Sequence, residues 1–537
     1  MGDLSPRPGE DLLDATGCVV TPGLINTHHH LFQSVMKGVP AGMNASLDDW
    51  LAPVPYTLWP RLDEETLRIS ARIGLAELAL SGATSVCDHH YIFSNRYDYD
   101  PAEVLFDEAA KLGLRFVLGR GDMTRGRVFD DPGIPPAPTE TLTQFLDGLS
   151  AAARRWHDPS DLSMTRGACA PITPNFNFAP DALPHIAAGA RHLGLRLHAH
   201  LSENTAYAAH TLAAFGQRPV PWLAGLDWLG EDVWFAHLVD VDPAEVALLA
   251  QTGTAMAHCP QANARLGSGI APADALHAHG GTVSMADDGA AANEAADMGA
   301  ALYSSFTVHR ASKGVAAADP AVILHWVTMG GARALGYPAL GQIAPGKGAD
   351  ITLFDLCAPR NFGLHDPALA PMITGAAQVR HSFVSGRHVV RDGTLPGLNL
   401  KDLAQDVARV TTQLARPACH IPFLTGVEAV SASVASVIAP PNPKETTMNT
   451  PTNLAELERE SSYGSYGIEV ERDIPQIDMS DYFNRKAEIS DALWEAAMGI
   501  GFFQLFNHGI PQTLIDDAFA SRRASLPCRP RRKSNTP

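Results

Sequence analysis

The sequence of 537 residues has few cysteines and no long apolar run. The seven cysteines are scattered and form no Cys-x-x-Cys pair, so neither a disulfide framework nor a zinc ribbon is expected. No apolar stretch reaches the roughly 18 residues of a membrane span, and the amino terminus lacks the apolar core of a signal peptide. The sequence therefore predicts a cytoplasmic protein without a membrane partner.

Positive charge is also in short supply. Lys and Arg number 40 against 58 Asp and Glu, which gives a net charge of −18 and argues against nucleic acid as a partner. Disorder is excluded because 45% of the residues are hydrophobic. The unusual abundance is in histidine, with 22 residues, so their positions become the main question.

A helix, a glycine and a short strand follow one another repeatedly through the first two thirds of the chain. In one such unit an amphipathic helix over 64–80 is followed by Gly82 and a strand over 83–87, and in another a helix over 101–112 by Gly113 and a strand over 114–118. This alternation predicts parallel strands joined by helices. We expect a (β/α)8 barrel of the α/β class, with a doubly wound sheet as the alternative.

The remaining segments differ in composition from these repeats. We expect residues 1–22 and 338–420 to form a small β-sandwich domain beside a barrel over 23–337. Residues 421–455 are rich in Ala, Ser, Val and Pro and predict a linker. Residues 456–537 predict a separate α/β segment with a basic tail.

Histidines and acids end several of the predicted strands. His28 and His30 close an apolar run from Val19 to Ile25, and residues two apart share one face of a strand. His200 and His237 end two further strands, and Asp288 follows another. The triplet alone could be a polar turn, but the joint pattern predicts a metal site, because imidazoles and a carboxylate suit Zn²⁺ or Fe²⁺.

A carboxylate lies close in sequence to one of these histidines. Glu203 follows His200 by three residues and is placed for general acid–base catalysis. A divalent ion lowers the pKa of water toward about 7, which prepares it for hydrolysis. The pattern therefore predicts a metal-dependent hydrolase.

The motifs at 22–30, 200–203, 237, 258–260, 263–272 and 288–289 resemble those of the amidohydrolase superfamily, in its cytosine/guanine deaminase-like branch. The resemblance implies that one divalent metal is bound by His28, His30, His200 and Asp288. It also implies that Glu203 shuttles a proton to the substrate ring, that Asp288 deprotonates the attacking water, and that His237 orients this water or polarises the substrate. A homo-oligomer is implied as well.

Substrate contacts are implied for four residues: Gln33, His237, Asn263 and Arg265. Gln33 could instead face solvent, and Arg265 could be a structural charge in a loop. Residues 27–34 and 81–90 look most like 8-oxoguanine deaminases, with hydroxytriazine aminohydrolases as close relatives. Ala262, Ala290 and Ala292 replace the family's usual serines, so purine specificity follows less firmly than metal binding.

The resemblance thus implies hydrolytic deamination of an oxidised purine or a related N-heterocycle, with release of ammonia. The alternative within enzymes is an s-triazine aminohydrolase or chlorohydrolase. Alternatives of another class are an inactive fusion relic and a bifunctional protein with an oxygenase-like part. The segment before Pro22 is shorter than is usual in the family, so we expect the β-sandwich to be incomplete.

Residues 474–479 and 496–511 resemble the amino-terminal segment of isopenicillin N synthase-like 2-oxoglutarate/Fe(II) oxygenases. The family's iron ligands lie in a later double-stranded β-helix, which has no counterpart in this sequence, and His508 belongs to the segment's own motif. We therefore expect a truncated piece of an oxygenase, joined to the barrel by fusion of two neighbouring reading frames.

Overall fold

The computed structural model describes residues 7–94, 97–127, 134, 136–415, 476–481, 484–499 and 504–507. The chain divides into two compact units, Met1–Ile421 and Pro422–Pro537. Each is described by itself.

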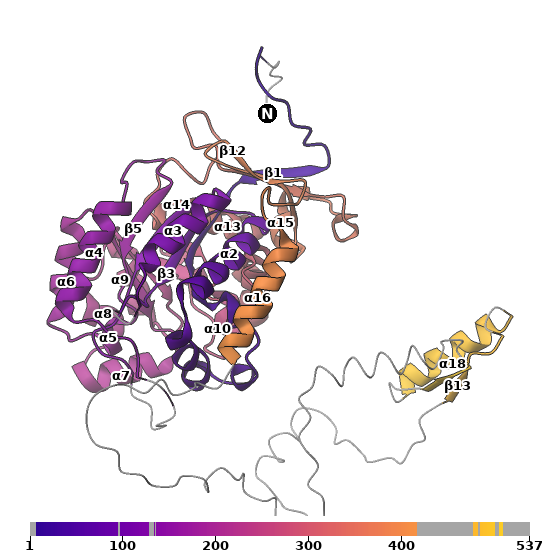
Figure 1. The fold of residues 1–537 in the computed structure, drawn as a ribbon, viewed down its shortest axis with the longest axis horizontal. Coiled ribbons are helices and arrows are strands. Elements are labelled where there is room, and N and C mark those ends of the chain that lie inside the picture. Colours follow the sequence, from indigo (N-terminus) through magenta and orange to yellow (C-terminus); the bar gives the residue numbers. More distant parts are fainter. Residues whose placement is uncertain are drawn as a thin grey trace, which may run out of the picture. The chain divides into compact units, whose positions relative to one another are not determined.

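The first unit is built around eight parallel strands that follow chain order (Figure 1). Hydrogen bonds connect the last of these strands to the first, so the sheet closes on itself. The Thr27 hydroxyl donates to the Met285 carbonyl at 3.0 Å, and the Asp288 N–H donates to the His28 carbonyl at 3.3 Å. The prediction of a (β/α)8 barrel is confirmed. The strands are β2 (Leu24–His29), β3 (Ala83–His90), β4 (Arg115–Arg120), β5 (Thr165–Cys169), β6 (Arg196–Leu201), β7 (Val233–His237), β8 (Ala255–His258) and β9 (Val283–Met285).

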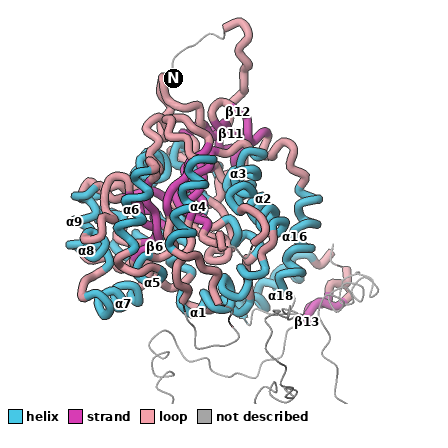
Figure 2. The backbone as a smooth tube through the Cα atoms, turned by 60° about the vertical axis from the view of Figure 1, so that its left-hand side comes forward, coloured by secondary structure: helices cyan, strands magenta, loops and turns pink. Residues whose placement is uncertain are grey.

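Helices surround these strands, and Figure 2 shows them as an outer layer. The helix ends have the expected capping residues. For example, Asp100 caps the helix that begins at Pro101, and Gly113 ends that helix with a φ of 81°. The helices are α1 (Leu47–Leu51), α2 (Glu64–Leu80), α3 (Pro101–Leu112), α4 (Leu142–Trp156), α5 (Pro174–Asn177), α6 (Ala182–His192), α7 (Thr205–Phe215), α8 (Pro219–Ala224), α9 (Pro243–Thr252), α10 (Pro260–Arg265), α11 (Ala273–Ala278), α12 (Met298–Lys313), α13 (Pro320–His325), α14 (Gly331–Ala334), α15 (Ala370–Ile373) and α16 (Leu400–Ala415).

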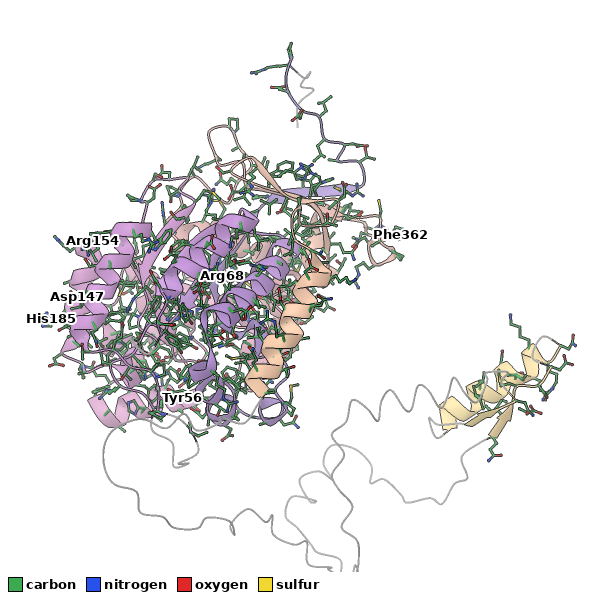
Figure 3. The ribbon with its side chains drawn as sticks, viewed as in Figure 1. Tyr56, Arg68, Asp147, Arg154, His185 and Phe362 are labelled. Carbon is green, nitrogen blue, oxygen red and sulfur yellow. The ribbon has the colours of Figure 1, made fainter. Side chains whose placement is uncertain are left out.

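The hydrophobic core lies between the strands and this helical layer and inside the barrel itself. Strands β2, β3, β4 and β7 are buried along their whole length, as expected for parallel strands covered on both faces. Side chains fill the space between ribbons throughout (Figure 3). Polar side chains buried at the strand ends are therefore held firmly by their surroundings.

A second sheet lies beside the barrel and is antiparallel. It contains β1 (Cys18–Pro22), β10 (Ile351–Asp355), β11 (Gln378–Val384) and β12 (Arg387–Arg391), in the order β1-β10-β11-β12. The interpretation of the apolar run from Val19 to Ile25 as one barrel strand is wrong, because the run divides at Gly23. A side chain there would collide with that of Thr84, and the Gly23 N–H donates to the Asp350 carbonyl at 2.9 Å.

The second unit contains β13 (Gln476–Asp478), α18 (Lys486–Gly499) and β14 (Gln504–Phe506), with the two strands parallel. It is a small α/β element, as the sequence predicts. The expected linker and the basic tail lie outside the described residues. In the part of the chain that the structure describes, no helix is both long and apolar enough to cross a membrane.

Candidate metal and catalytic site

The imidazole of His28, on β2, is oriented by a relay of hydrogen bonds. His198 Nδ1 donates to the Trp234 carbonyl at 3.0 Å, and burial lowers the pKa of His198 to about 3, so its Nε2 is an acceptor. His28 Nδ1 donates to this Nε2 at 2.8 Å. His28 Nε2 therefore carries a lone pair, and it is buried without a hydrogen-bond partner among the described residues.

Two further imidazoles are oriented by backbone carbonyls. His30 Nδ1 donates to the His89 carbonyl at 2.8 Å, and His200 Nδ1 donates to the Ile172 carbonyl at 2.7 Å. Burial holds the pKa of both rings well below its usual value, so both are neutral. Their Nε2 atoms, each with a lone pair, face each other at 3.0 Å.

Asp288 brings a carboxylate to the same point. Its Oδ1 lies 3.4 Å from His28 Nε2 and 3.3 Å from His30 Nε2. Asp288 has a φ of 67°, a backbone conformation that is strained for any residue other than glycine. His29 Nδ1 donates to the Asp288 backbone carbonyl at 2.6 Å. His29 therefore points away from the cluster and holds Asp288 in place.

The Nε2 lone pairs of His28, His30 and His200 and one oxygen of Asp288 thus lie close together, with no proton among them to form a hydrogen bond. Such an arrangement is repulsive unless a cation lies in the middle. Separations of 3.0–3.4 Å suit atoms that share an ion with ligand bonds of about 2.0–2.2 Å. The residues present therefore fit one divalent metal.

Beside this cluster, Glu203 faces His237. His237 Nδ1 donates to the Asn263 side-chain oxygen at 2.8 Å, which leaves His237 Nε2 3.6 Å from Glu203 Oε2. The Tyr207 hydroxyl donates to the same oxygen at 3.4 Å. Burial raises the pKa of Glu203 to about 7, a value suited to exchanging protons near neutral pH.

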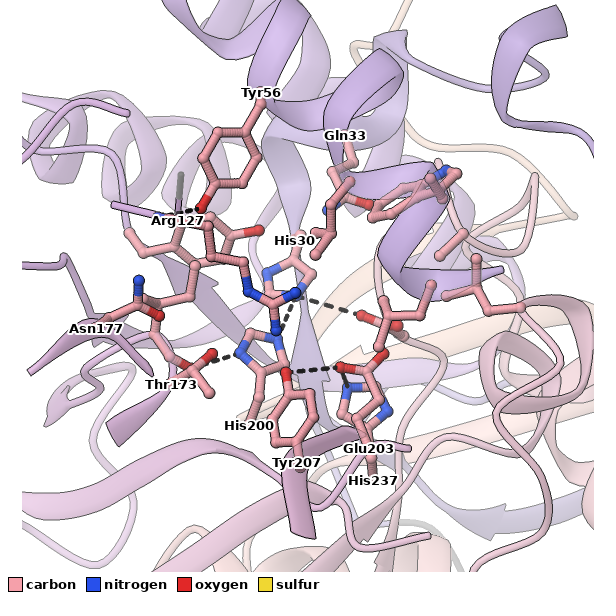
Figure 4. A pocket seen from close by; sticks show the side chains of 18 of the residues that line it. His30, Gln33, Tyr56, Arg127, Thr173, Asn177, His200, Glu203, Tyr207 and His237 are labelled. Carbon is pink, nitrogen blue, oxygen red and sulfur yellow. Dashed lines mark hydrogen bonds and ion pairs between the residues drawn. The ribbon is translucent and has the colours of Figure 1, made fainter. Parts of the chain in front are cut away.

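A cavity opens onto these groups and is lined by both polar and aromatic side chains. Figure 4 shows His30, His200, Glu203 and His237 among the side chains that line it. The other lining residues are Gln33, Leu47, Trp50, Leu51, Tyr56, Trp59, Tyr91, Arg127, Ile172, Thr173, Asn177, Tyr207, Leu266, Asp288 and Ala292.

The candidate substrate contacts occupy different places. Gln33 lines the cavity, and its buried oxygen has no hydrogen-bond partner among the described residues. Asn263 is buried behind His237 and contacts it. Arg265 does not line the cavity: its guanidinium donates to Glu294 and to the Gly42 carbonyl, both at 2.9 Å.

Sequence reasoning missed three residues of this region, namely Arg127, His198 and His89. Arg127 lines the cavity, pairs with Asp48 at 2.7 Å and lies 4.3 Å above the Phe176 ring. It lies in a loop with no motif to mark it. His198 repeats the His-x-His spacing of the first triplet two residues before His200, a signal that could have found it.

The profile described as "Amidohydrolase family" matches residues 19–389, well over half of the chain. The chain belongs to the amidohydrolase family. A profile described as "non-haem dioxygenase in morphine synthesis N-terminal" matches residues 474–526, which confirms the resemblance of the carboxyl-terminal segment to the amino-terminal part of such oxygenases.

Similar proteins include an isoxanthopterin deaminase from an unknown prokaryotic organism, 44% identical over 78% of this chain and 90% of its own length. An 8-oxoguanine deaminase from Pseudomonas aeruginosa is 36% identical over 76% of this chain and 89% of its own. The predicted family and enzyme class, a hydrolase of carbon–nitrogen bonds, are confirmed.

A solved structure of atrazine chlorohydrolase from Arthrobacter aurescens TC1, complexed with zinc, aligns with a TM-score of 0.70. It is 26% identical and covers 76% of this chain and 92% of its own. Amidohydrolases are generally metal-dependent, and the histidine cluster is consistent with this property.

Proposed function

We propose that the chain is a metal-dependent deaminase that hydrolyses an amino group from an oxidised purine or a related bicyclic heterocycle and releases ammonia. The observation that carries the proposal is the convergence of three imidazole lone pairs and one carboxylate beside a protonatable glutamate, next to a cavity that several of these residues line. Two deaminases of oxidised bicyclic rings, with 44% and 36% identity, support this choice of substrate class.

In this proposal His28, His30, His200 and Asp288 hold one divalent ion. Three neutral imidazoles and a carboxylate suit Zn²⁺, with Fe²⁺ as the alternative. The ion supplies Lewis acidity that activates a water molecule for attack on the amino-bearing carbon.

The surrounding side chains then handle the protons. The Asp288 carboxylate accepts a proton from the attacking water. Glu203 Oε2 donates a proton to the ring nitrogen beside the reacting carbon. The Asp288 carboxyl group then passes its proton to the amino nitrogen, which leaves as ammonia when the C–N bond breaks, and Glu203 recovers the hydroxyl proton as the carbonyl forms. Because His237 Nδ1 is committed to Asn263, the atom left to orient the water or to polarise the substrate is Nε2, 3.6 Å from Glu203 Oε2.

Substrate recognition is proposed to rest on Gln33, His237 and Arg127. The Gln33 side chain offers an oxygen with no hydrogen-bond partner among the described residues, and the Arg127 guanidinium offers N–H donors to ring oxygen atoms. The position of Asn263 supports a role through His237. Arg265, which lies outside the cavity lining, is proposed to position the loop that carries Leu266.

The test is ammonia release by the full-length, metal-loaded chain from isoxanthopterin, 8-oxoguanine, guanine and hydroxyatrazine. We expect turnover of one of the first two at the highest kcat/KM. Preference for hydroxyatrazine would instead establish the triazine alternative. A folded, metal-loaded sample that releases no ammonia from any of the four would favour an inactive relic.

We further propose a small-molecule substrate as the main partner, a cytoplasmic location and a homo-oligomeric assembly. A net charge of −18 supports the first point, and the five cysteines of the described residues are all unpaired, which suits a reducing compartment. Light scattering on the purified chain measures the assembly directly.

A further inference from the structure

A fourth imidazole lies beside the proposed metal ligands. His89, near the end of β3, donates from Nε2 to the Ala170 carbonyl at 2.7 Å. The ring is fully buried, and no acceptor for a second N–H lies near its Nδ1 among the described residues. His89 Nδ1 therefore carries a lone pair.

This lone pair has no hydrogen-bond partner among the described residues. A buried acceptor left without a donor is destabilising, and such atoms in folded proteins usually have a function or an unseen partner. A sequence that merely needed to fill this space could do so with an apolar ring.

The surroundings of His89 point to what that partner is. One nitrogen from each of His28, His30, His89 and His200 lies within 4.8 Å of the other three. The His89 ring stacks on that of His200, with centroids 4.7 Å apart and an angle of 29°. In addition, the His89 carbonyl orients His30.

We propose that His89 Nδ1 is a further ligand of the metal, approaching from the barrel interior. This inference rests on the proposed metal site. His30, His200 and Asp288 line the cavity, whereas His28 and His89 do not. His28 and His89 would therefore enclose the ion on the side away from the cavity and leave its cavity side open to water and substrate.

The carboxyl end of β5 has a part in this arrangement. The carbonyls of Ala170 and Ile172, two residues apart, fix the tautomers of His89 and His200 respectively. One short segment thus orients two stacked imidazoles toward the same ion. With His28, His30 and Asp288, the ion has five protein ligands, more than the four of a tetrahedral zinc site.

The test uses the full-length chain loaded with Co²⁺, whose visible absorption strengthens as the coordination number falls. We expect His89→Gln to give a stronger visible band and to weaken metal affinity by about 10–100-fold in competition with a chelator. The matched control is His90→Gln. His90 is the buried neighbour on the same strand, donates to the Ile92 carbonyl at 3.2 Å and does not line the cavity. We expect this variant to keep the spectrum and the affinity of the unaltered chain.

A folded His89→Gln variant with unchanged spectrum and affinity would overturn the assignment. If that variant does not fold, the metal-loaded crystal structure of the unaltered chain decides: we expect a metal–Nδ1 distance of about 2.0–2.2 Å, and more than about 3 Å refutes the proposal. A chain that deaminates and binds metal through the other ligands alone leaves the proposed function intact. A folded chain that binds no divalent metal overturns both.

Discussion

Replacing His198 by phenylalanine tests whether the hydrogen-bond relay prepares His28 for metal. The phenyl ring keeps the stack on Trp234, whose ring centroid lies 4.5 Å from that of His198 at 17°, but it removes the acceptor 2.8 Å from His28 Nδ1. A buried N–H without a partner costs about 1–3 kcal/mol. His28 can avoid that cost only by moving its proton to Nε2, which removes the lone pair offered to the metal.

The expected effect follows from this competition between tautomers. A penalty of about 1.4–2.8 kcal/mol corresponds to a 10–100-fold weaker metal affinity, the range typical for loss of a residue that supports a ligand. Competition with a chelator at pH 7.5 measures the dissociation constant, and metal content after dialysis gives a second value. His198→Gln, whose amide oxygen can accept a hydrogen bond, is the control and should recover part of the affinity.

One result would refute this role of His198. If the phenylalanine variant is folded, shows the thermal unfolding of the unaltered chain and binds metal with the same dissociation constant, the relay does not determine the tautomer of His28. A loss of thermal stability with unchanged metal affinity would lead to the same conclusion, because it would limit His198 to a packing role.

Glu203→Gln should lower kcat by about 10²–10⁴-fold and leave metal content unchanged, since it removes the proton carrier but no proposed ligand; loss of metal would contradict this. Because burial raises the pKa of Glu203 to about 7, its carboxyl group carries the proton that it donates only below that value, and kcat/KM should fall as the pH rises through 7. Gly289→Ala should raise KM, because the added methyl group would meet the Gln33 side-chain oxygen; unchanged Michaelis kinetics would remove Gln33 from the substrate contacts. Burial alone would raise the pKa of the Glu108 carboxyl group, but hydrogen bonds from Arg72 and other cations lower it. The contribution of Glu108 to the free energy of unfolding is therefore fully present above its unfolded pKa of about 4.3. It is lost as the pH falls through the lower pKa of the folded state. Glu108→Gln should destabilise the fold by about 1.5–3 kcal/mol at pH 7 and by little at pH 3, measured by urea unfolding.

Local patterns in the sequence predicted the barrel well because each pattern has a local cause. The helix over residues 64–80 ends before a turn at Gly82, and the one over residues 101–112 ends at a left-handed Gly113. The strand division at Gly23 escaped prediction, since the close approach of Thr84 that demands a glycine comes from another part of the chain.

The candidate site was likewise predictable from the sequence only in part. The strand-end positions of His28, His30, His200 and Asp288 were visible as spacing, and the structure brings them together. The tautomers were not visible, because they depend on acceptors such as the Trp234 and Ile172 carbonyls, which reach the site from other strands or loops. Sequence spacing identifies which atoms can be ligands, whereas the folded backbone decides where their protons lie.

The position of β1 has a consequence for how the protein is made. Among the strands that the structure describes, β1 lies at the end of its sheet and pairs with β10, and nearly the whole barrel is encoded between these two strands. At synthesis rates of about 5–20 residues per second, β1 waits on the order of tens of seconds for this partner. The next strand, β2, waits almost as long for β9 and the carboxylate of Asp288. His28, His30, His200 and Asp288 can therefore be brought together only after the last barrel strand has been synthesised, and until then the edges of β1 and β2 lack these partners.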